Sequence, residues 1–302
     1  MQVSWRGVFP AATTQFAPDL SVDIAATQKV QDALVRDGVH GLVVMGTVGE
    51  NNALEPGEKR AVLKAAVEAV GGRAPVIAGV SELDTPRAVA FARDAERLGA
   101  DALMVLPAMV YVPAEAELAA HLSAVAEATT LPIMLYNNPP AYRVSITFPV
   151  LERLSRHRNI VCIKESAPDT RRFTDLYNAF GDRFALFAGL DDVALEGLLL
   201  GASGWVSGLT NAFPKESLAL YQAAVRGDLE TARMIYRWFM PLLHLDAEHD
   251  LVQCIKLAEQ IMDRGSERVR PPRHVLEGAR RAQVIAMVER AAATRPETAA
   301  AA

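Results

Sequence analysis

Eight short apolar runs recur along the first two-thirds of the chain, and a longer segment with helical periodicity follows each one. Runs of this kind, rich in Val, Ile, Leu and Ala, are typical of strands buried on both faces. They cover residues 7–11, 41–45, 75–78, 102–106, 132–136, 160–163, 184–188 and 203–207. We expect a strand at each range. The segments between them predict helices, for example one capped by Ser21 that runs to about residue 38 and one that opens at Pro56 and runs to about residue 70.

Strands that alternate with helices predict parallel strands joined by crossover helices, and therefore an α/β fold. Eight such units match a closed (β/α)8 TIM barrel. The competing architecture is a doubly wound open sheet, but no Gly-x-Gly-x-x-Gly motif follows the first predicted strand.

After Pro214 the strand pattern stops and only amphipathic helical runs remain. They cover residues 216–226, 229–245, 250–262 and about 274–293. We therefore assign residues 1–226 to a barrel domain and 227–293 to a C-terminal helical region. Residues 294–302 end in an alanine run and are expected to be a disordered tail.

Composition excludes several classes of protein. The 302 residues are 51% hydrophobic and 22% charged, with a net charge of −5, which gives no electrostatic footprint for nucleic acid or an anionic membrane. No apolar run is long enough to span a bilayer, and residues 1–6 lack the pattern of a signal peptide. The two cysteines, Cys162 and Cys254, form no disulfide or metal framework. We expect a cytoplasmic protein.

The candidate chemistry follows from the barrel, because active sites of this fold lie where strands run out into their following loops. Lys164 ends a buried strand. A lysine there either extends its amine to water or, when desolvated, provides a neutral amine that attacks carbonyl carbon. Tyr136 ends the preceding strand and should lie within reach of Lys164. Other polar residues at strand ends are Thr13, Thr14, Thr47, Glu50, Asn137, Asp191, Asp192 and Ser207.

Four segments in this order resemble the dihydrodipicolinate synthase/N-acetylneuraminate lyase family. They are Gly46-Thr-Val-Gly-Glu50, Tyr136-Asn-Asn-Pro139, Ile163-Lys-Glu165 and Gly189-Leu-Asp-Asp192. The resemblance implies a (β/α)8 barrel with C-terminal helices, a homotetramer or homodimer, and no metal or other cofactor. It further implies that Lys164 forms a Schiff base with pyruvate or another 2-oxo acid. Tyr136 and Thr47 would then relay protons, and the backbone N–H of Val48 would bind the substrate carboxylate.

The resemblance also implies substrate contacts at Asn137, Arg143, Gly189, Asp191, Asp192, Val206 and Ser207. In dihydrodipicolinate synthases an arginine near the Tyr-Asn motif binds the carboxylate of the second substrate. The best-aligned residue here is Ala141, and Arg143 lies two positions later. Tyr111 could replace one of the tandem tyrosines that the family carries in that loop. The segments 136–143 and 164–169 look most like a catabolic branch, the Δ1-pyrroline-4-hydroxy-2-carboxylate deaminases, which make 2,5-dioxopentanoate and ammonia.

Alternative functions stay open. The chain could be a dihydrodipicolinate synthase, another pyruvate-type aldolase or a sugar-acid dehydratase, all of which would use Lys164. It could also be a non-catalytic protein that binds 2-oxo acids. A metal-dependent hydrolase is disfavoured because the polar cluster at residues 244–250 has its two histidines five positions apart, away from one helix face. We interpret that cluster as a solvated or inter-helix polar patch.

Overall fold

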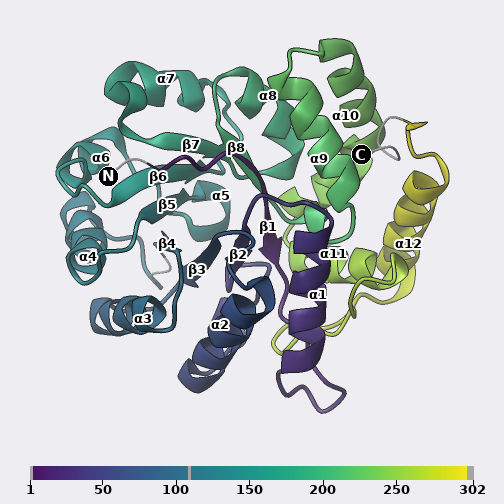
Figure 1. Cartoon of the computed structure of the whole chain (residues 1–302), viewed down its shortest axis with the longest axis horizontal. Coiled ribbons are helices and arrows are strands. Elements are labelled where there is room, and N and C mark those ends of the chain that lie inside the picture. Colours follow the sequence, from purple (N-terminus) through teal and green to yellow (C-terminus); the bar gives the residue numbers. More distant parts are fainter. Residues whose placement is uncertain (1–2, 108–109, 298–302) are drawn as a thin grey trace.

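Eight parallel strands close into a barrel in the computed structural model, which describes residues 3–107 and 110–297 (Figure 1). Each strand pairs with the next in the sequence, and β8 pairs with β1 to close the ring. The strands are β1 (Gly7–Ala12), β2 (Leu42–Val44), β3 (Val76–Val80), β4 (Ala102–Val105), β5 (Ile133–Asn137), β6 (Ile160–Glu165), β7 (Ala185–Ala188) and β8 (Gly204–Ser207). The expected TIM barrel is confirmed, and all eight predicted strands are present.

Helices surround the barrel because their apolar stripes pack on the outward side chains of the strands. They are α1 (Ile24–Arg36), α2 (Pro56–Val70), α3 (Thr85–Arg97), α4 (Glu115–Glu127), α5 (Pro139–Tyr142), α6 (Phe148–Leu154), α7 (Arg171–Phe180), α8 (Ala194–Leu199) and α9 (Pro214–Val225). The expected cap at Ser21 is wrong. Asp23 caps α1, since its carboxylate accepts a hydrogen bond from the backbone N–H of Ala26 at 2.9 Å.

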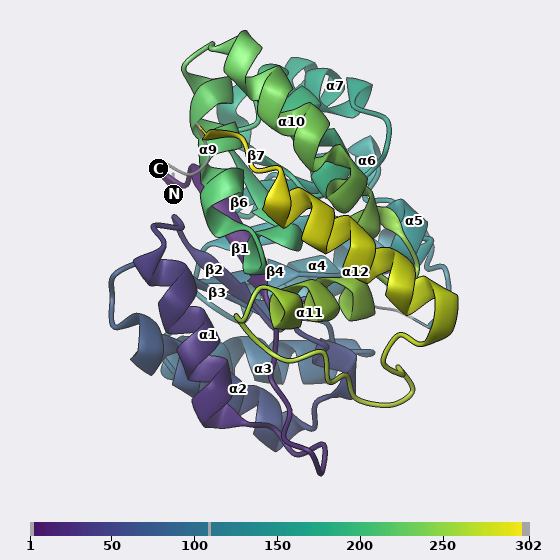
Figure 2. The same ribbon diagram turned by 90° about the vertical axis from the view of Figure 1, so that its right-hand side faces the viewer.

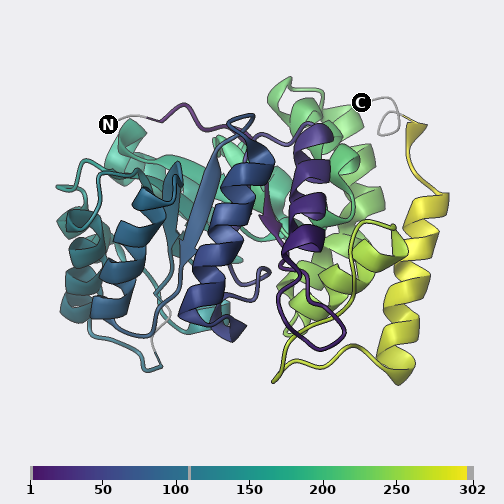
Figure 3. The same ribbon diagram turned by 60° about the horizontal axis from the view of Figure 1, so that its bottom comes forward.

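Three further helices lie together against one side of the barrel, as Figures 2 and 3 show. They are α10 (Leu229–Leu243), α11 (Leu251–Ile261) and α12 (Gly278–Ala293). The predicted helix over 229–245 ends earlier, at Leu243, and a 3-10 turn, η5 (His244–Ala247), follows it. The predicted start of the last helix near residue 274 is also too early, because α12 begins at Gly278.

Residues 294–297 follow α12 and make contacts with the helical region and the barrel. Thr294 accepts a hydrogen bond from the Trp238 indole at 3.2 Å, and Arg295 forms an ion pair with Glu216 at 3.1 Å. Residues 298–302, which belong to the predicted disordered tail, lie outside the described residues. Over the described ranges no helix combines the length and apolar character needed to cross a membrane.

Candidate active site

Lys164 and Tyr136 are direct neighbours across two strands. Lys164 lies on β6 and pairs in register with Tyr136 on β5, as their positions at adjacent strand ends predict. The Lys164 amine lies 3.9 Å from the centre of the Tyr136 ring. Both side chains are buried, with 5% of Lys164 and 4% of Tyr136 exposed. Lys164 therefore does not extend its amine into bulk water.

Burial changes the acid–base properties of this pair. Desolvation lowers the pKa of Lys164 to about 8, although the nearby carboxylates of Asp246 and Asp191 oppose the shift. Desolvation also raises the pKa of Tyr136 to about 12. A neutral lysine amine is the nucleophile that attacks a carbonyl or imine carbon, and a protonated phenol beside it can donate or receive the proton that this attack moves.

Gly189 provides the space for Lys164. It follows β7, and a Cβ atom at this position would lie 2.8 Å from Cγ and 2.9 Å from Cε of Lys164. The same Cβ would also collide with the Ser166 hydroxyl, so a side chain here would displace Ser166 and Lys164. The glycine of the Gly189-Leu-Asp-Asp192 segment thus has a steric role beside the amine.

Two further hydroxyl groups, those of Thr47 and Tyr142, lie next to Tyr136. The Thr47 hydroxyl forms a hydrogen bond of 2.5 Å with the Tyr142 hydroxyl, and the Tyr142 ring packs edge-on against Tyr136. The Tyr136 hydroxyl accepts a hydrogen bond from the Asn138 amide at 2.8 Å. Thr47 and two tyrosines therefore surround the approach to the lysine, where they can move protons to and from a bound substrate.

Two adjoining cavities open at this end of the barrel. The inner one, of about 30 Å³, is lined by Lys164, Tyr136, Thr47, Val48, Gly189 and Val206 among others, so it brings six of the predicted site residues together. The outer one, of about 510 Å³, continues toward solvent and is lined in part by Thr47, Asn138, Tyr142, Asp246, Glu248, His249 and Arg273. Within the described chain the backbone N–H groups of Thr47 and Val48 donate no hydrogen bond to protein atoms, so they are available to an anionic ligand.

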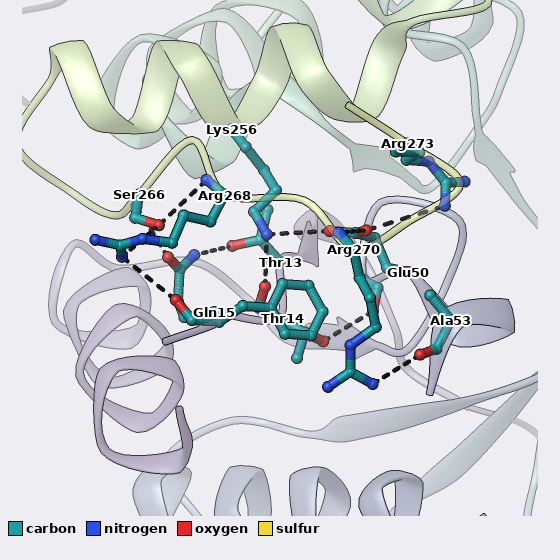
Figure 4. A network of polar contacts seen from close by, with 12 residues as sticks. Thr13, Thr14, Gln15, Glu50, Ala53, Lys256, Ser266, Arg268, Arg270 and Arg273 are labelled. Carbon is teal, nitrogen blue, oxygen red and sulfur yellow. Dashed lines mark hydrogen bonds and ion pairs between the residues drawn. The ribbon is translucent and has the colours of Figure 1, made fainter. Parts of the chain in front are cut away.

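The loop that carries Thr47 and Val48 is held from below by a buried polar network (Figure 4). Glu50 ends this loop, and its carboxylate accepts hydrogen bonds from the Lys256 amine and the Arg270 backbone N–H, both at 3.0 Å. Lys256 also donates to the Thr14 carbonyl at 2.8 Å. These contacts join the C-terminal helix α11 to the ends of β1 and β2, so the loop has few alternative positions.

Asp191 and Ser207, two further predicted site residues, line neither cavity. The Asp191 carboxylate accepts hydrogen bonds from the Trp205 indole at 2.9 Å, the Leu209 backbone N–H at 2.8 Å and the Ser207 hydroxyl at 3.2 Å. Burial, followed by the nearby Asp246, raises the pKa of Asp191 well above its usual range. Asp191 thus ties the loop after β7 to β8, and in its ionised form it raises the pKa of Lys164.

Asn137, Asp192 and Arg143 also lie outside the cavity linings. Asn137 donates to the Glu165 carboxylate at 2.7 Å and accepts from the Ile146 backbone N–H at 2.8 Å, which fixes the strand end beside Lys164. Asp192 accepts a hydrogen bond from His244 at 2.9 Å. Arg143 ends α5 in a left-handed conformation and is exposed. The fixed contacts of Asn137 and the exposure of Arg143 leave neither side chain in the cavities.

The polar cluster at 244–250 does not converge on one point. No group of three metal-ligating side chains occurs in the described residues. His244 contacts Asp192, whereas Glu248 and Asp250 pair with Arg280. The interpretation as a solvated or inter-helix polar patch fits His244 and Asp250, whereas Asp246, Glu248 and His249 line the outer cavity.

Sequence reasoning missed several residues that line the site, among them Asn138, Tyr142, Asp246, Leu251 and Arg273. Asn138 and Tyr142 belong to the segment quoted for the Tyr-Asn motif, so their closeness to Tyr136 was a usable signal. The other three come from beyond the barrel. No strand-end rule applies to them, because their position depends on how the C-terminal helices pack.

Comparison with known proteins places this geometry in a family. A model described as the dihydrodipicolinate synthetase family matches residues 4–291. The chain belongs to this family. A 4-hydroxy-tetrahydrodipicolinate synthase of Exiguobacterium sibiricum is 36% identical over 239 residues, which are 79% of this chain and 82% of that protein. The protein of the same name from Salinibacter ruber is 36% identical over 240 residues, 79% of this chain and 80% of that protein.

Solved structures of the dihydrodipicolinate synthetase family agree over nearly the whole chain. A putative dihydrodipicolinate synthetase from Pseudomonas aeruginosa matches with a TM-score of 0.91 and 32% identity, over 95% of this chain and 100% of that one. YagE, a prophage protein of E. coli solved in complex with pyruvate, matches with a TM-score of 0.90 and 27% identity, over 96% and 99%. The chain is accordingly an enzyme of this family, a lyase of class I type, in which a lysine forms the Schiff base.

Proposed function

We propose that this enzyme uses Lys164 to form a Schiff base with a small 2-oxo acid or its cyclic imine, and that its substrate is Δ1-pyrroline-4-hydroxy-2-carboxylate. The observation that carries the proposal is the buried amine of Lys164, which lies 3.9 Å from the Tyr136 ring and lines the inner cavity. No cofactor is needed, because the lysine iminium itself withdraws electrons from the neighbouring carbon.

The deaminase chemistry begins when the neutral Lys164 amine attacks C2 of the ring imine. The C2–N bond to the ring nitrogen breaks, and Tyr136 is placed to move the proton that converts this nitrogen into a free amine on C5. Loss of a C3 proton gives an enamine, and the enamine expels the C4 hydroxyl as water. Tautomerisation gives an imine at C5. Two hydrolyses then release ammonia and 2,5-dioxopentanoate and restore the lysine, with a net consumption of one water.

Two features support this substrate over a synthase reaction. The segments 136–143 and 164–169 resemble the deaminase branch. In addition, the position where dihydrodipicolinate synthases carry their carboxylate-binding arginine is Ala141, and Arg143 is exposed and lines neither cavity. A pyrroline carboxylate has a single carboxylate, for which the N–H groups of Thr47 and Val48 are available.

The names of the relatives favour a second candidate, 4-hydroxy-tetrahydrodipicolinate synthase. Such an enzyme would bind a second, carboxylate-bearing substrate after pyruvate. Arg273 lines the outer cavity, and in this candidate function its guanidinium would bind that carboxylate.

The deciding experiment is borohydride trapping followed by intact mass and peptide mapping. The protein is treated with pyruvate and, separately, with Δ1-pyrroline-4-hydroxy-2-carboxylate, and ammonia release is measured in parallel. We expect a reduced adduct on Lys164 with both compounds and ammonia from the second. Lys164→Ala should abolish both signals, and Lys64→Ala, which removes an exposed lysine of α2, should change neither.

Each other outcome selects an alternative. A pyruvate adduct without ammonia release would refute the deaminase, and products from pyruvate with an aldehyde, or from a sugar acid, would then identify a synthase, aldolase or dehydratase. Absence of an adduct with any 2-oxo acid would favour a non-catalytic 2-oxo acid binding protein.

The proposed assembly is a homotetramer or homodimer. Val110, Tyr111 and Val112 follow one another in the loop after β4, and their side chains are 84%, 58% and 66% exposed. Three consecutive exposed apolar residues support a contact with a second copy. Light scattering of Tyr111→Ser should show a smaller species, and an unchanged mass would contradict a role for this loop.

A further inference from the structure

Among the described residues, Asp246 is the one with a carboxyl, amine, guanidinium or imidazole group that lines both cavities. Five other residues line both cavities, namely Thr47, Asn138, Ala141, Leu190 and Leu251. Asp246 comes from η5, beyond the barrel, and only 9% of it is exposed. A carboxyl group at the junction of the two spaces faces whatever part of a substrate extends from Lys164 toward the outer cavity.

The surroundings of Asp246 leave its carboxyl group free for a ligand. No described side chain donates a hydrogen bond to it, and the donor that it faces is the backbone N–H of Asp191. Asp191, in contrast, accepts hydrogen bonds from two side chains and one backbone N–H. Space for Asp246 is provided by Gly208 at the end of β8, where an added Cβ would collide with Oδ1 of Asp246. A buried carboxyl group without a side-chain donor has unused hydrogen-bonding capacity, which buried polar groups rarely keep without a function.

The charges around Asp246 allow it to exchange a proton near neutral pH. Burial raises its pKa to about 6, opposed by Lys164 from β6 and the Asp191 backbone N–H, while Asp192 of η3 raises it further. His244, on the same turn as Asp246, is paired with Asp192. With its pKa raised, Asp246 carries a proton more often at neutral pH than an ordinary aspartate does.

We propose that Asp246 is the general acid that expels the C4 hydroxyl group of the substrate. This inference rests on the proposed deaminase reaction. As the enamine pushes electrons from C3 toward C4, the C4–O bond breaks, and its electron pair stays on oxygen. The oxygen takes the proton of Asp246 and leaves as water. The resulting Asp246 carboxylate takes a proton from solvent at the outer cavity, which restores the acid, and the conjugated iminium then tautomerises by exchanging its C5 and C4 protons with water.

The test separates imine formation from elimination with Asp246→Asn, which keeps the shape and removes the acid. We expect borohydride to trap pyruvate on Lys164 in the variant as in the wild type, and deuterium exchange at C3 of pyruvate to continue. Ammonia release from Δ1-pyrroline-4-hydroxy-2-carboxylate should fall by at least about 100-fold, the usual contribution of general acid catalysis. Glu230→Gln, which changes an exposed carboxylate of α10, should have wild-type activity in all three assays.

A substrate whose leaving group needs no proton separates acid catalysis from a structural role of Asp246. Structural damage in Asp246→Asn would slow the reaction of both substrates, whereas loss of the acid would slow only the reaction that expels a hydroxyl group. The 4-chloro analogue loses chloride without protonation, so Asp246→Asn should process it within about threefold of the wild-type rate. Equal losses on the hydroxy and chloro substrates would overturn the proposal, as would ammonia release close to the wild-type rate.

The two proposals fail in different ways. If the wild type traps pyruvate but releases no ammonia, both the substrate assignment and the proposed role of Asp246 are refuted. If the wild type releases ammonia and Asp246→Asn does so equally well, only the role of Asp246 falls. Should Asp246→Asn not fold, as judged by its melting curve, Asp246→Glu keeps the acid, and we expect it to retain more than about a tenth of the ammonia release. An Asp246→Glu enzyme that traps pyruvate normally but loses ammonia release would overturn the proposal.

Discussion

Replacing Lys256 with methionine should cost the fold several kcal/mol. Lys256 and Glu50 are fully buried and lie 3.0 Å apart, and the Lys256 amine also donates to the Thr14 carbonyl at 2.8 Å. Methionine keeps most of the length of the side chain but removes the amine, which lies 4.5 Å from the centre of the Phe16 ring and is the closest cation to the Glu50 carboxylate. Removing one partner of a buried ion pair typically costs about 3–5 kcal/mol, because the other charge stays buried.

The remaining contacts of Glu50 set the expected value within that range. The Arg270 backbone N–H still donates at 3.0 Å, and the Arg273 guanidinium lies at 4.0 Å. We therefore expect the lower end, about 3 kcal/mol. For a chain of this size such a loss corresponds to a fall of roughly 5–10 °C in the melting temperature.

Urea unfolding followed by circular dichroism, together with thermal melts, measures this loss. Lys64→Met is the matched control, because that lysine is exposed and its only ion pair among the described residues, with Glu68, spans 3.8 Å. It should change stability by less than about 0.5 kcal/mol. The double variant Glu50→Gln/Lys256→Met should recover part of the loss, since it removes both charges. A loss below about 1 kcal/mol for Lys256→Met, or a double variant as costly as the sum of the single ones, would refute the reasoning.

Two further predictions concern the reactive lysine. Gly189→Ala should reduce trapping of pyruvate on Lys164 and lower stability by about 1–3 kcal/mol, because the new methyl group would lie under 3 Å from two carbons of Lys164. An alanine variant that traps pyruvate at the wild-type rate and melts normally would contradict this steric role. The rate of trapping at limiting pyruvate should rise about tenfold per pH unit and level off near pH 8, because the pKa of Lys164 is lowered to about 8 and the neutral amine reacts. A rate that keeps rising to about pH 10 would mean that the amine behaves like an exposed lysine.

The barrel and its reactive pair could be predicted from the sequence because both depend on local patterns. Buried apolar runs mark the strands, and the order of the chain makes β5 and β6 neighbours, so Tyr136 and Lys164 had to meet. The direction of a side chain on a strand could be predicted from the same pattern, and the substrate contact expected at Asn137, the last residue of β5, overlooked it. Asn137 follows Tyr136 directly, yet it is committed to Glu165 and Ile146. A strand alternates its faces with each residue, so one step along the chain changes the surroundings completely.

The position of Asp246 at the site could not be predicted from the sequence for a different reason. Its position depends on α10 ending at Leu243 and on the 3-10 turn that follows, and helix ends are the least certain part of a prediction from periodicity. The sequence showed a group of charged residues at 244–250, which is equally typical of a solvated turn. Only the packing of that turn against the barrel mouth distinguishes a surface carboxylate from one that lines a cavity.

The contribution of η5 and α11 to the site has a consequence for the order in which a newly made chain becomes active. Synthesis proceeds from the N-terminus, so all eight strands and the amine of Lys164 leave the ribosome before Asp246 and Lys256 do. A chain arrested after α9 would hold the nucleophile but lack one wall of the inner cavity and the cation beneath the Thr47 loop. The proposed elimination would therefore become possible only after the last helices pack against the barrel. Activity would then indicate that translation has been completed.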